Sequence, residues 1–209
     1  MVDGLNPGVS QIDEPFVVLV VCSGNICRSP MAEVLLQRDL VAVGVPGRVA
    51  SAGTLGLVRP VDPFAVDAVR RFGLDLSGRT SRPLTASDVN RSHLVLGLAR
   101  EHVREVALIS PPALSRTFTL KEFVRRAESF GLRRPDTPVA TWLDELVRGR
   151  ANTASLGASD DDDVEDPVGE PQPVFDRVAG EIAVLCRSAA GALAGRSQQP
   201  PPAPLHIDW

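Results

Sequence analysis

The sequence contains no tyrosine and few other aromatic residues, which together make up 4% of the chain. Only three cysteines occur among 209 residues, an odd number that excludes a disulfide-stabilised secreted scaffold. The net charge of −4 provides no basic surplus, which argues against a nucleic-acid partner. No basic patch precedes the first apolar run, so we expect no signal peptide.

Long apolar segments are also missing. The run Phe16–Cys22 is far too short to span a membrane, so no membrane partner is expected. Hydrophobic residues nevertheless make up 44% of the chain, which is enough for a packed core. These observations predict a soluble protein of a reducing compartment, the cytoplasm, and leave its oligomeric state open.

The distribution of apolar residues divides the chain into three parts. We expect a disordered leader over 1–14, a domain over 15–195 with an insertion at about 112–163, and a proline-rich disordered tail over 196–209. Within the insertion, the composition of Arg150–Asp163 predicts a mobile loop. The four aspartates at its end, 160–163, are interpreted as solvated charge.

Alternating strands and helices indicate an α/β fold. The continuous β-branched run Phe16–Val21 is typical of a strand buried on both faces of a parallel sheet. Three further strands are expected at Arg48–Ser51, His93–Leu98 and Thr117–Leu120. Helices are expected from the cap Ser29-Pro30 to about Val43, from the cap Asp62-Pro63 to Gly73, and over Arg100–Leu108, Lys121–Phe130, Val139–Val147 and about Pro173–Leu193. The pattern predicts three α/β/α layers around a four-stranded parallel sheet, with the site at the carboxyl ends of the strands.

The segment between the first strand and the first helix carries the candidate chemistry. Cys22 ends the strand, a glycine-containing loop runs to Arg28, and the helix begins at Ser29. Inward-turned backbone N–H groups and the helix N-terminus favour a bound phosphate dianion. Arg28 adds a planar fork of donors that matches phosphate oxygens. The same surroundings favour the thiolate form of Cys22, which is the nucleophilic form.

The string Val21–Pro30, followed by Met31-Ala32-Glu33, resembles the signature loop of bacterial low-molecular-weight protein-tyrosine phosphatases nearly residue for residue. Four other segments are similar to the same family: Ser51–Thr54, Gly73–Ser77, Ser81–Thr85 and Asp166-Pro167. The resemblance covers about residues 16–110 and 164–193. The stretch between them is longer than the family usually has.

The resemblance implies an enzyme, a phosphatase that hydrolyses phosphotyrosine in proteins through a cysteinyl-phosphate intermediate without a cofactor. It implies Cys22 as the nucleophile, Arg28 as the phosphate clamp and Asp166 as the general acid. Seven residues would bind phosphate or support the loop: Ser23, Gly24, Asn25, Ile26, Cys27, Ser29 and Ser51. Among them, Asn25 would maintain the strained loop with the help of Ser51, and Ser29 would donate to the thiolate.

The remaining cysteines and the histidines predict no metal site. Ligand spacing is missing among Cys27, Cys186, His93, His102 and His206. Cys27 has two interpretations, a small packed group or a thiol that traps oxidised Cys22 as a reversible disulfide. Cys186 lies on the apolar side of the last predicted helix and is expected in the core.

The ring-binding wall departs from the family. Val168 follows Asp166-Pro167, and Leu57 stands nearest the second wall position, where the family has aromatic residues. Aliphatic contact therefore replaces stacking on a phenyl ring, unless Phe64 or Trp142 reaches the site. An aromatic pair contributes about 0.5–1.5 kcal/mol beyond burial, so a higher KM for aryl phosphates is expected.

The loop support departs as well. Arg79 stands where the family often has a histidine that buttresses the loop. His93 occupies a place often held by an acidic residue. Neither change affects the nucleophile, the clamp or the acid.

Three alternative functions remain open. Protein-arginine phosphatases resemble this chain but tend to have threonine at the position of Ile26, whose apolar side chain suits a phenyl phosphate better. An arsenate reductase-like enzyme would need a relay of cysteines, and none occurs between Cys27 and Cys186. A non-catalytic phosphate-binding module would have the same loop without turnover.

Overall fold

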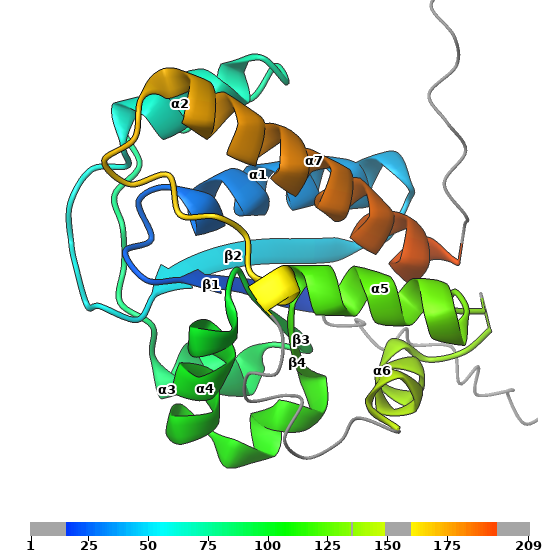
Figure 1. The fold of residues 1–209 in the computed structure, drawn as a ribbon. Coiled ribbons are helices and arrows are strands. Elements are labelled where there is room, and N and C mark those ends of the chain that lie inside the picture. Colours follow the sequence, from blue (N-terminus) through cyan, green and yellow to red (C-terminus); the bar gives the residue numbers. More distant parts are fainter. Residues whose placement is uncertain (1–15, 135, 149–159, 196–209) are drawn as a thin grey trace, which may run out of the picture.

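The computed structural model describes residues 16–134, 136–148 and 160–195 (Figure 1). The predicted leader and tail lie outside these residues, as does most of the predicted mobile loop. The division of the chain into leader, domain, insertion and tail therefore stays a prediction.

Four strands form one sheet, in the order β2-β1-β3-β4. They are β1 (Phe16–Cys22), β2 (Gly47–Gly53), β3 (Leu94–Gly97) and β4 (Thr117–Thr119), and every neighbouring pair is parallel. Alternate residues of β1 point to opposite faces, so Val18 and Val20 enter one buried cluster and Leu19 and Val21 enter another. The predicted four-stranded parallel sheet is confirmed.

Helices cover both faces of this sheet (Figure 1). The helices are α1 (Arg28–Ala42), α2 (Pro63–Arg70), α3 (Ala86–Arg91), α4 (Arg100–Ile109), α5 (Leu120–Phe130), α6 (Val139–Val147) and α7 (Gln172–Ala194). One layer contains α1, α2, α5 and α7, and the opposite layer contains α3 and α4. The three-layer α/β/α architecture predicted from the sequence is therefore confirmed.

The long helix α7 packs along α1 in the larger layer. Phe175, Ile182 and Cys186 are fully buried on its inner face. The Cys186 thiol lies 3.7 Å from the carbonyl oxygen of Ala32, so the expectation of a core cysteine is confirmed. Among the described residues, we find no helix whose length and hydropathy would let it cross a lipid bilayer.

Two local predictions about helix starts need correction. The helix α1 begins at Arg28 with Cys27 as its N-cap, so the predicted cap at Ser29 was wrong. Ser29 is buried, and its hydroxyl faces the loop instead of the helix N-terminus. The helix α3 was not predicted, although Thr85 and Asp88 form a capping box at its start.

The interpretation of the acidic run 160–163 as solvated charge was wrong for Asp162 and Asp163. Residues Asp160–Asp162 form a short 3-10 helix, and the Asp162 carboxylate pairs with Arg125 of α5. Asp163 pairs with Arg100 at the start of α4. These two ion pairs fix the chain where it approaches the carboxyl ends of the strands.

Candidate active site

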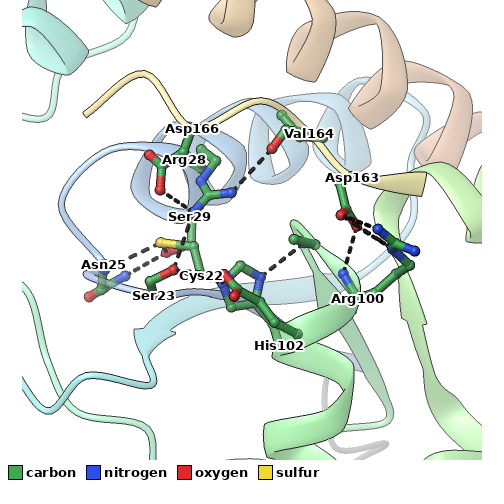
Figure 2. Close-up of polar contacts among 12 residues, drawn as sticks. Cys22, Ser23, Asn25, Arg28, Ser29, Arg100, His102, Asp163, Val164 and Asp166 are labelled. Carbon is green, nitrogen blue, oxygen red and sulfur yellow. Dashed lines mark hydrogen bonds and ion pairs between the residues drawn. The ribbon is translucent and has the colours of Figure 1, made fainter. Parts of the chain in front are cut away.

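The segment after β1 curls around the Cys22 sulfur, which is buried with 3% of the residue exposed (Figure 2). The backbone N–H of Asn25 donates to this sulfur over 3.2 Å. The Ser29 hydroxyl lies 2.9 Å from it. Donors aimed at sulfur favour a negative charge there, and the start of α1 adds the positive end of a helix dipole.

Asn25 gives the loop its shape. Its φ of +53° lies in the left-handed region, and no other non-glycine residue that the structure describes adopts a positive φ. Its side-chain amide donates to the hydroxyls of Ser29 and Ser51 over 2.9 Å each. Its amide oxygen accepts from the backbone N–H of Arg82 over 2.9 Å. These three bonds hold a backbone conformation that would otherwise be unfavourable.

Gly53, at the end of β2, lets the neighbouring chain approach the loop closely. A Cβ at this position would lie 2.8 Å from the carbonyl oxygen of Ser23, a contact that no side chain can make. The N–H groups of Thr54 and Leu55 donate to the carbonyls of Cys22 and Ser23 over 3.1 and 3.0 Å. The similarity noted at Ser51–Thr54 therefore falls on a segment that supports the loop.

A carboxylate and an arginine extend this support outward. Ser51 donates to Oε2 of Glu33 over 2.6 Å, and Arg79 donates to Oε1 of the same carboxylate over 2.6 Å. Arg79 thus acts on the loop through Glu33, which was not foreseen. His93 lies at the opposite end of β1, where its Nδ1 accepts from the N–H of Val17, and it does not support the loop.

Arg28 connects the loop to the chain that contains the candidate acid. Its guanidinium donates to the carbonyl of Val164 over 3.1 Å and to Asp166 Oδ2 over 2.5 Å (Figure 2). The guanidinium nitrogen that bonds to Asp166, Nη2, also lies 3.3 Å from the Ser23 hydroxyl. Only 5% of the arginine side chain is exposed, against 43% of the aspartate, so Asp166 sits at the open side of the site. The structure therefore brings Cys22, Arg28 and Asp166 together.

The segment with Asp166 is anchored beside α4. The Asp163 carboxylate accepts from the backbone N–H of Arg100 over 2.8 Å and from its guanidinium over 3.0 to 3.2 Å. Burial alone would raise the pKa of Asp163, but these hydrogen bonds and the Arg100 charge hold it below its ordinary value. A pocket of about 390 Å³ opens between this segment and the start of α4, and Arg28 lines its wall.

A buried histidine touches the loop from the opposite layer. His102 Nε2 lies 3.0 Å from the Ser23 hydroxyl, although 79 positions separate the two residues. From the sequence, His102 was considered only as a metal ligand. Its position just after β3, at the carboxyl end of a parallel strand, was the available signal.

Cys27 lies within the loop but points into the core, where 2% of it is exposed. Burial raises the pKa of its thiol far above the ordinary value, and the negative charge of Asp62 acts in the same direction. Its thiol therefore stays protonated.

The ring-binding wall is mostly aliphatic. Leu57 reaches over the loop, where its Cδ1 would lie 4.0 Å from a Cβ at Gly24. Trp142 cannot contribute, because it is buried with its indole N–H bonded to the carbonyl of Gly131. Phe64 is 43% exposed and shares a small pocket with Gly169 in the segment after Asp166. Of Phe64 and Trp142, Phe64 is therefore the one that lies beside the segment of the predicted acid.

Within the part of the chain that the structure describes, no group of three or more His, Cys, Asp or Glu side chains is arranged to hold a metal ion. A thiol, a guanidinium and a carboxylate converge at the loop after β1. This combination suits transfer of a phosphoryl group to sulfur, which defines the class of cysteine-dependent phosphatases.

Comparison with known proteins identifies the family. The family model described as "Low molecular weight phosphotyrosine protein phosphatase" matches residues 17–138. The Escherichia coli K12 low molecular weight protein-tyrosine-phosphatase Etp is 38% identical over 112 residues, which cover 53% of this chain and 73% of Etp. A Bacillus subtilis protein-arginine-phosphatase is 34% identical over 108 residues, which cover 51% of this chain and 71% of that protein.

Solved structures agree with this result. The low molecular weight protein tyrosine phosphatase from T. tengcongensis is 30% identical, with a TM-score of 0.62 over 83% of this chain and 96% of that one. The chain belongs to the low molecular weight phosphotyrosine protein phosphatase family. The family, the fold and the phosphatase class predicted from the sequence are thereby confirmed.

Proposed function

We propose that this protein hydrolyses phosphotyrosine in phosphoproteins, with Cys22 as nucleophile, Arg28 as phosphate clamp and Asp166 as general acid. The observation that carries the proposal is the position of the Arg28 guanidinium, which bonds to the Ser23 hydroxyl and to the Asp166 carboxylate next to the Cys22 sulfur. A phosphate at this place would meet the nucleophile, the clamp and the acid at once.

In the first step, the Cys22 sulfur attacks phosphorus while the bond from phosphorus to the phenolic oxygen breaks. Asp166 gives its proton to that oxygen, so the phenol leaves uncharged. Arg28 and the loop N–H groups bind the equatorial oxygens and stabilise the charge of the transferring group. The product of this step is a cysteinyl phosphate and an Asp166 carboxylate.

In the second step, the Asp166 carboxylate accepts a proton from water, and the water oxygen attacks phosphorus. The bond between sulfur and phosphorus breaks, and the electron pair returns to Cys22. The Ser29 hydroxyl, 2.9 Å from the sulfur, donates to the departing thiolate and lowers its energy. Inorganic phosphate leaves, and the carboxyl is again protonated for the next cycle.

Phosphotyrosine is favoured as the substrate by the apolar surroundings of the loop. Leu57 lies beside Gly24, so a phenyl ring would find an aliphatic contact there. Phosphoarginine is the second candidate, because the B. subtilis relative is named a protein-arginine-phosphatase. Its guanidinium would need polar partners that Ile26 does not offer.

The three free cysteines support two further parts of the proposal. Free thiols fit a cytoplasmic location, where disulfides are rare. An arsenate reductase-like relay is disfavoured, because Cys186 is fully buried between α7 and α1 and its pKa is raised by burial. The proposed partner is a phosphotyrosine protein, with no nucleic acid or membrane.

The experiment that tests this function is steady-state hydrolysis of p-nitrophenyl phosphate, a phosphotyrosine peptide and a phosphoarginine protein without added metal. Turnover of the aryl phosphates that disappears in Cys22→Ser supports the proposal, and the ratio among the substrates identifies the preferred one. Turnover that persists in Cys22→Ser would place the nucleophile elsewhere. Binding of phosphate without turnover would support the non-catalytic module.

A further inference from the structure

His102 is fully buried at the start of α4, with 0% of the residue exposed. Its Nδ1 accepts from the backbone N–H of Ala99 over 2.9 Å (Figure 2). Its Nε2 lies 3.0 Å from the Ser23 hydroxyl and 3.3 Å from a Glu101 carboxylate oxygen. A backbone N–H can only donate, so Nδ1 carries no proton and Nε2 must carry it. The proton on Nε2 therefore points to Ser23 and Glu101.

Burial keeps His102 neutral. Burial, followed by the nearby positive charge of Arg28, lowers its pKa from 6.5 to about 3, although Asp163 acts in the opposite direction. Glu101, which is 62% exposed, is the second carboxylate near its ring. A neutral imidazole with a fixed tautomer donates one hydrogen bond of constant direction.

The Ser23 hydroxyl lies at the centre of three polar groups. It can accept from His102 Nε2 and from Arg28 Nη2, which lies 3.3 Å away, and it can donate to Glu101 over 3.2 Å. The oxygen has two lone pairs and one proton, so these three partners use its full capacity. The position of Ser23 Oγ thus depends on His102, and one nitrogen of the Arg28 fork depends on Ser23.

We propose that His102 is a positioning residue of the phosphatase site, which acts through the Ser23 hydroxyl to hold the Arg28 fork in the orientation that receives phosphate. The inference rests on the proposed role of Arg28 as the phosphate clamp. His102 itself does not touch the substrate. It brings a rigid donor from the opposite layer of the fold to a loop that also receives support from β2, from α1 and from the backbone N–H of Arg82.

The imidazole is more than a cap for α4. Capping the Ala99 N–H requires only one acceptor, which an asparagine could also provide. The second nitrogen is what distinguishes histidine here, because it reaches the phosphate loop. Two substitutions therefore separate the roles. His102→Asn keeps an acceptor near Ala99 and loses the donor to Ser23, whereas His102→Gln can place an amide donor near the Nε2 position.

Tungstate is a suitable probe, because it is a tetrahedral oxyanion shaped like phosphate and its binding needs no turnover. We expect His102→Asn to weaken tungstate binding, measured by calorimetry, and to lower kcat/KM by about 2- to 12-fold, the range for loss of one hydrogen bond. His102→Gln should recover most of both quantities. Equal losses in the two variants, or no loss in His102→Asn, would overturn the proposal.

The link through Ser23 is tested by a double-mutant cycle. In a Ser23→Ala background, His102→Asn should cause no further loss of tungstate affinity, because the shared hydroxyl is gone. Additive losses would show that His102 acts only on the stability of the fold. If the parent binds tungstate but turns nothing over, the proposed function fails, and the cycle still decides the inference.

A measurement on the unsubstituted protein covers the case in which the variants do not fold. The Nε2–H proton of His102, observed by NMR in 15N-histidine-labelled protein, should shift when tungstate binds, because Ser23 and Arg28 adjust to the anion. A resonance that does not move at saturating tungstate would contradict the coupling of His102 to the anion site through Ser23. The ring signals of His93, at the opposite end of β1, provide an internal control.

Discussion

Arg28 and Asp166 form an ion pair next to the proposed nucleophile Cys22, with Nη2 of the arginine 2.5 Å from Oδ2 of the aspartate. The guanidinium that should bind substrate phosphate is thus bonded to the proposed acid when no phosphate is present. A phosphate that takes over Arg28 must displace Asp166 from it. The displaced carboxyl then has an anion as its neighbour, and a neighbouring anion favours the protonated form that a general acid needs.

Asp166→Asn should therefore separate binding from turnover. Removing the competing carboxylate should tighten tungstate binding by up to about fivefold, because a half-exposed ion pair contributes about 0–1 kcal/mol. Hydrolysis of substrates with poor leaving groups should fall by about 100- to 10,000-fold, and good leaving groups should suffer less. Calorimetry and a leaving-group series measure the two effects. Glu165→Gln, which removes an exposed carboxylate from the same segment, is the matched control. Weaker tungstate binding in Asp166→Asn would contradict the idea that Asp166 competes with the anion for Arg28.

Asp163→Asn should loosen the anchor of the acid segment. The carboxylate holds both the backbone and the guanidinium of Arg100, so its loss removes charge-assisted hydrogen bonds at some distance from the phosphate. We expect kcat to fall by about 2- to 12-fold for poor leaving groups, the equivalent of about 0.5–1.5 kcal/mol, with tungstate affinity nearly unchanged. A parallel loss of tungstate affinity would mean that the anchor supports the phosphate loop itself and not the acid.

Local sequence signals predicted much of the fold. The continuous run in β1 gave the buried central strand, and Asp62 caps α2 with its side chain as its position before a proline suggested. The helix α6 has the predicted bounds, Val139–Val147. Each of these features depends on neighbours within a few positions, so a local pattern is sufficient to indicate it.

The partners of the phosphate loop depend on topology and could not be read locally. Ser23 meets His102 across 79 positions, and Arg125 meets Asp162 across 37. An aspartate in an acidic run has the same local pattern whether it is solvated or paired. Only the placement of α4 and α5 beside the strand ends decides which of the charges find an arginine.

We expect Glu33 to support the phosphate loop through its two carboxylate oxygens. Glu33→Ala removes the acceptor for Ser51 and the partner of Arg79, so we expect kcat/KM to fall by about 2- to 12-fold. Glu33→Gln keeps an acceptor and should lose less. Arg79→Gln should lie between the parent and Glu33→Ala, whereas Arg70→Gln, which breaks an exposed ion pair on α2, serves as the control. A kcat/KM in Glu33→Ala equal to that of the parent would show that Ser51 holds Asn25 without help from Glu33.

Stability at acid pH should report on the buried His102. The unfolded chain exposes an imidazole with a pKa of 6.5, whereas in the folded protein burial lowers this pKa to about 3. Between pH 6.5 and pH 3 the unfolded state therefore binds an extra proton, and the free energy of unfolding falls as the pH falls, by at most about 1.4 kcal/mol per pH unit. Above pH 6.5 this contribution is complete and independent of pH.

Replacing His102 removes the extra proton that the unfolded state binds at this imidazole, and it leaves all carboxylates in place. The free energy of unfolding, from urea titrations at pH 7, 6, 5 and 4, should fall less steeply with decreasing pH in His102→Asn than in the parent. His93→Asn, which removes an exposed histidine at the far end of β1, is the control for the loss of an imidazole as such. Parallel pH profiles for His102→Asn and the parent would mean that the buried imidazole accepts a proton in the folded state, and its fixed tautomer could then not persist at acid pH.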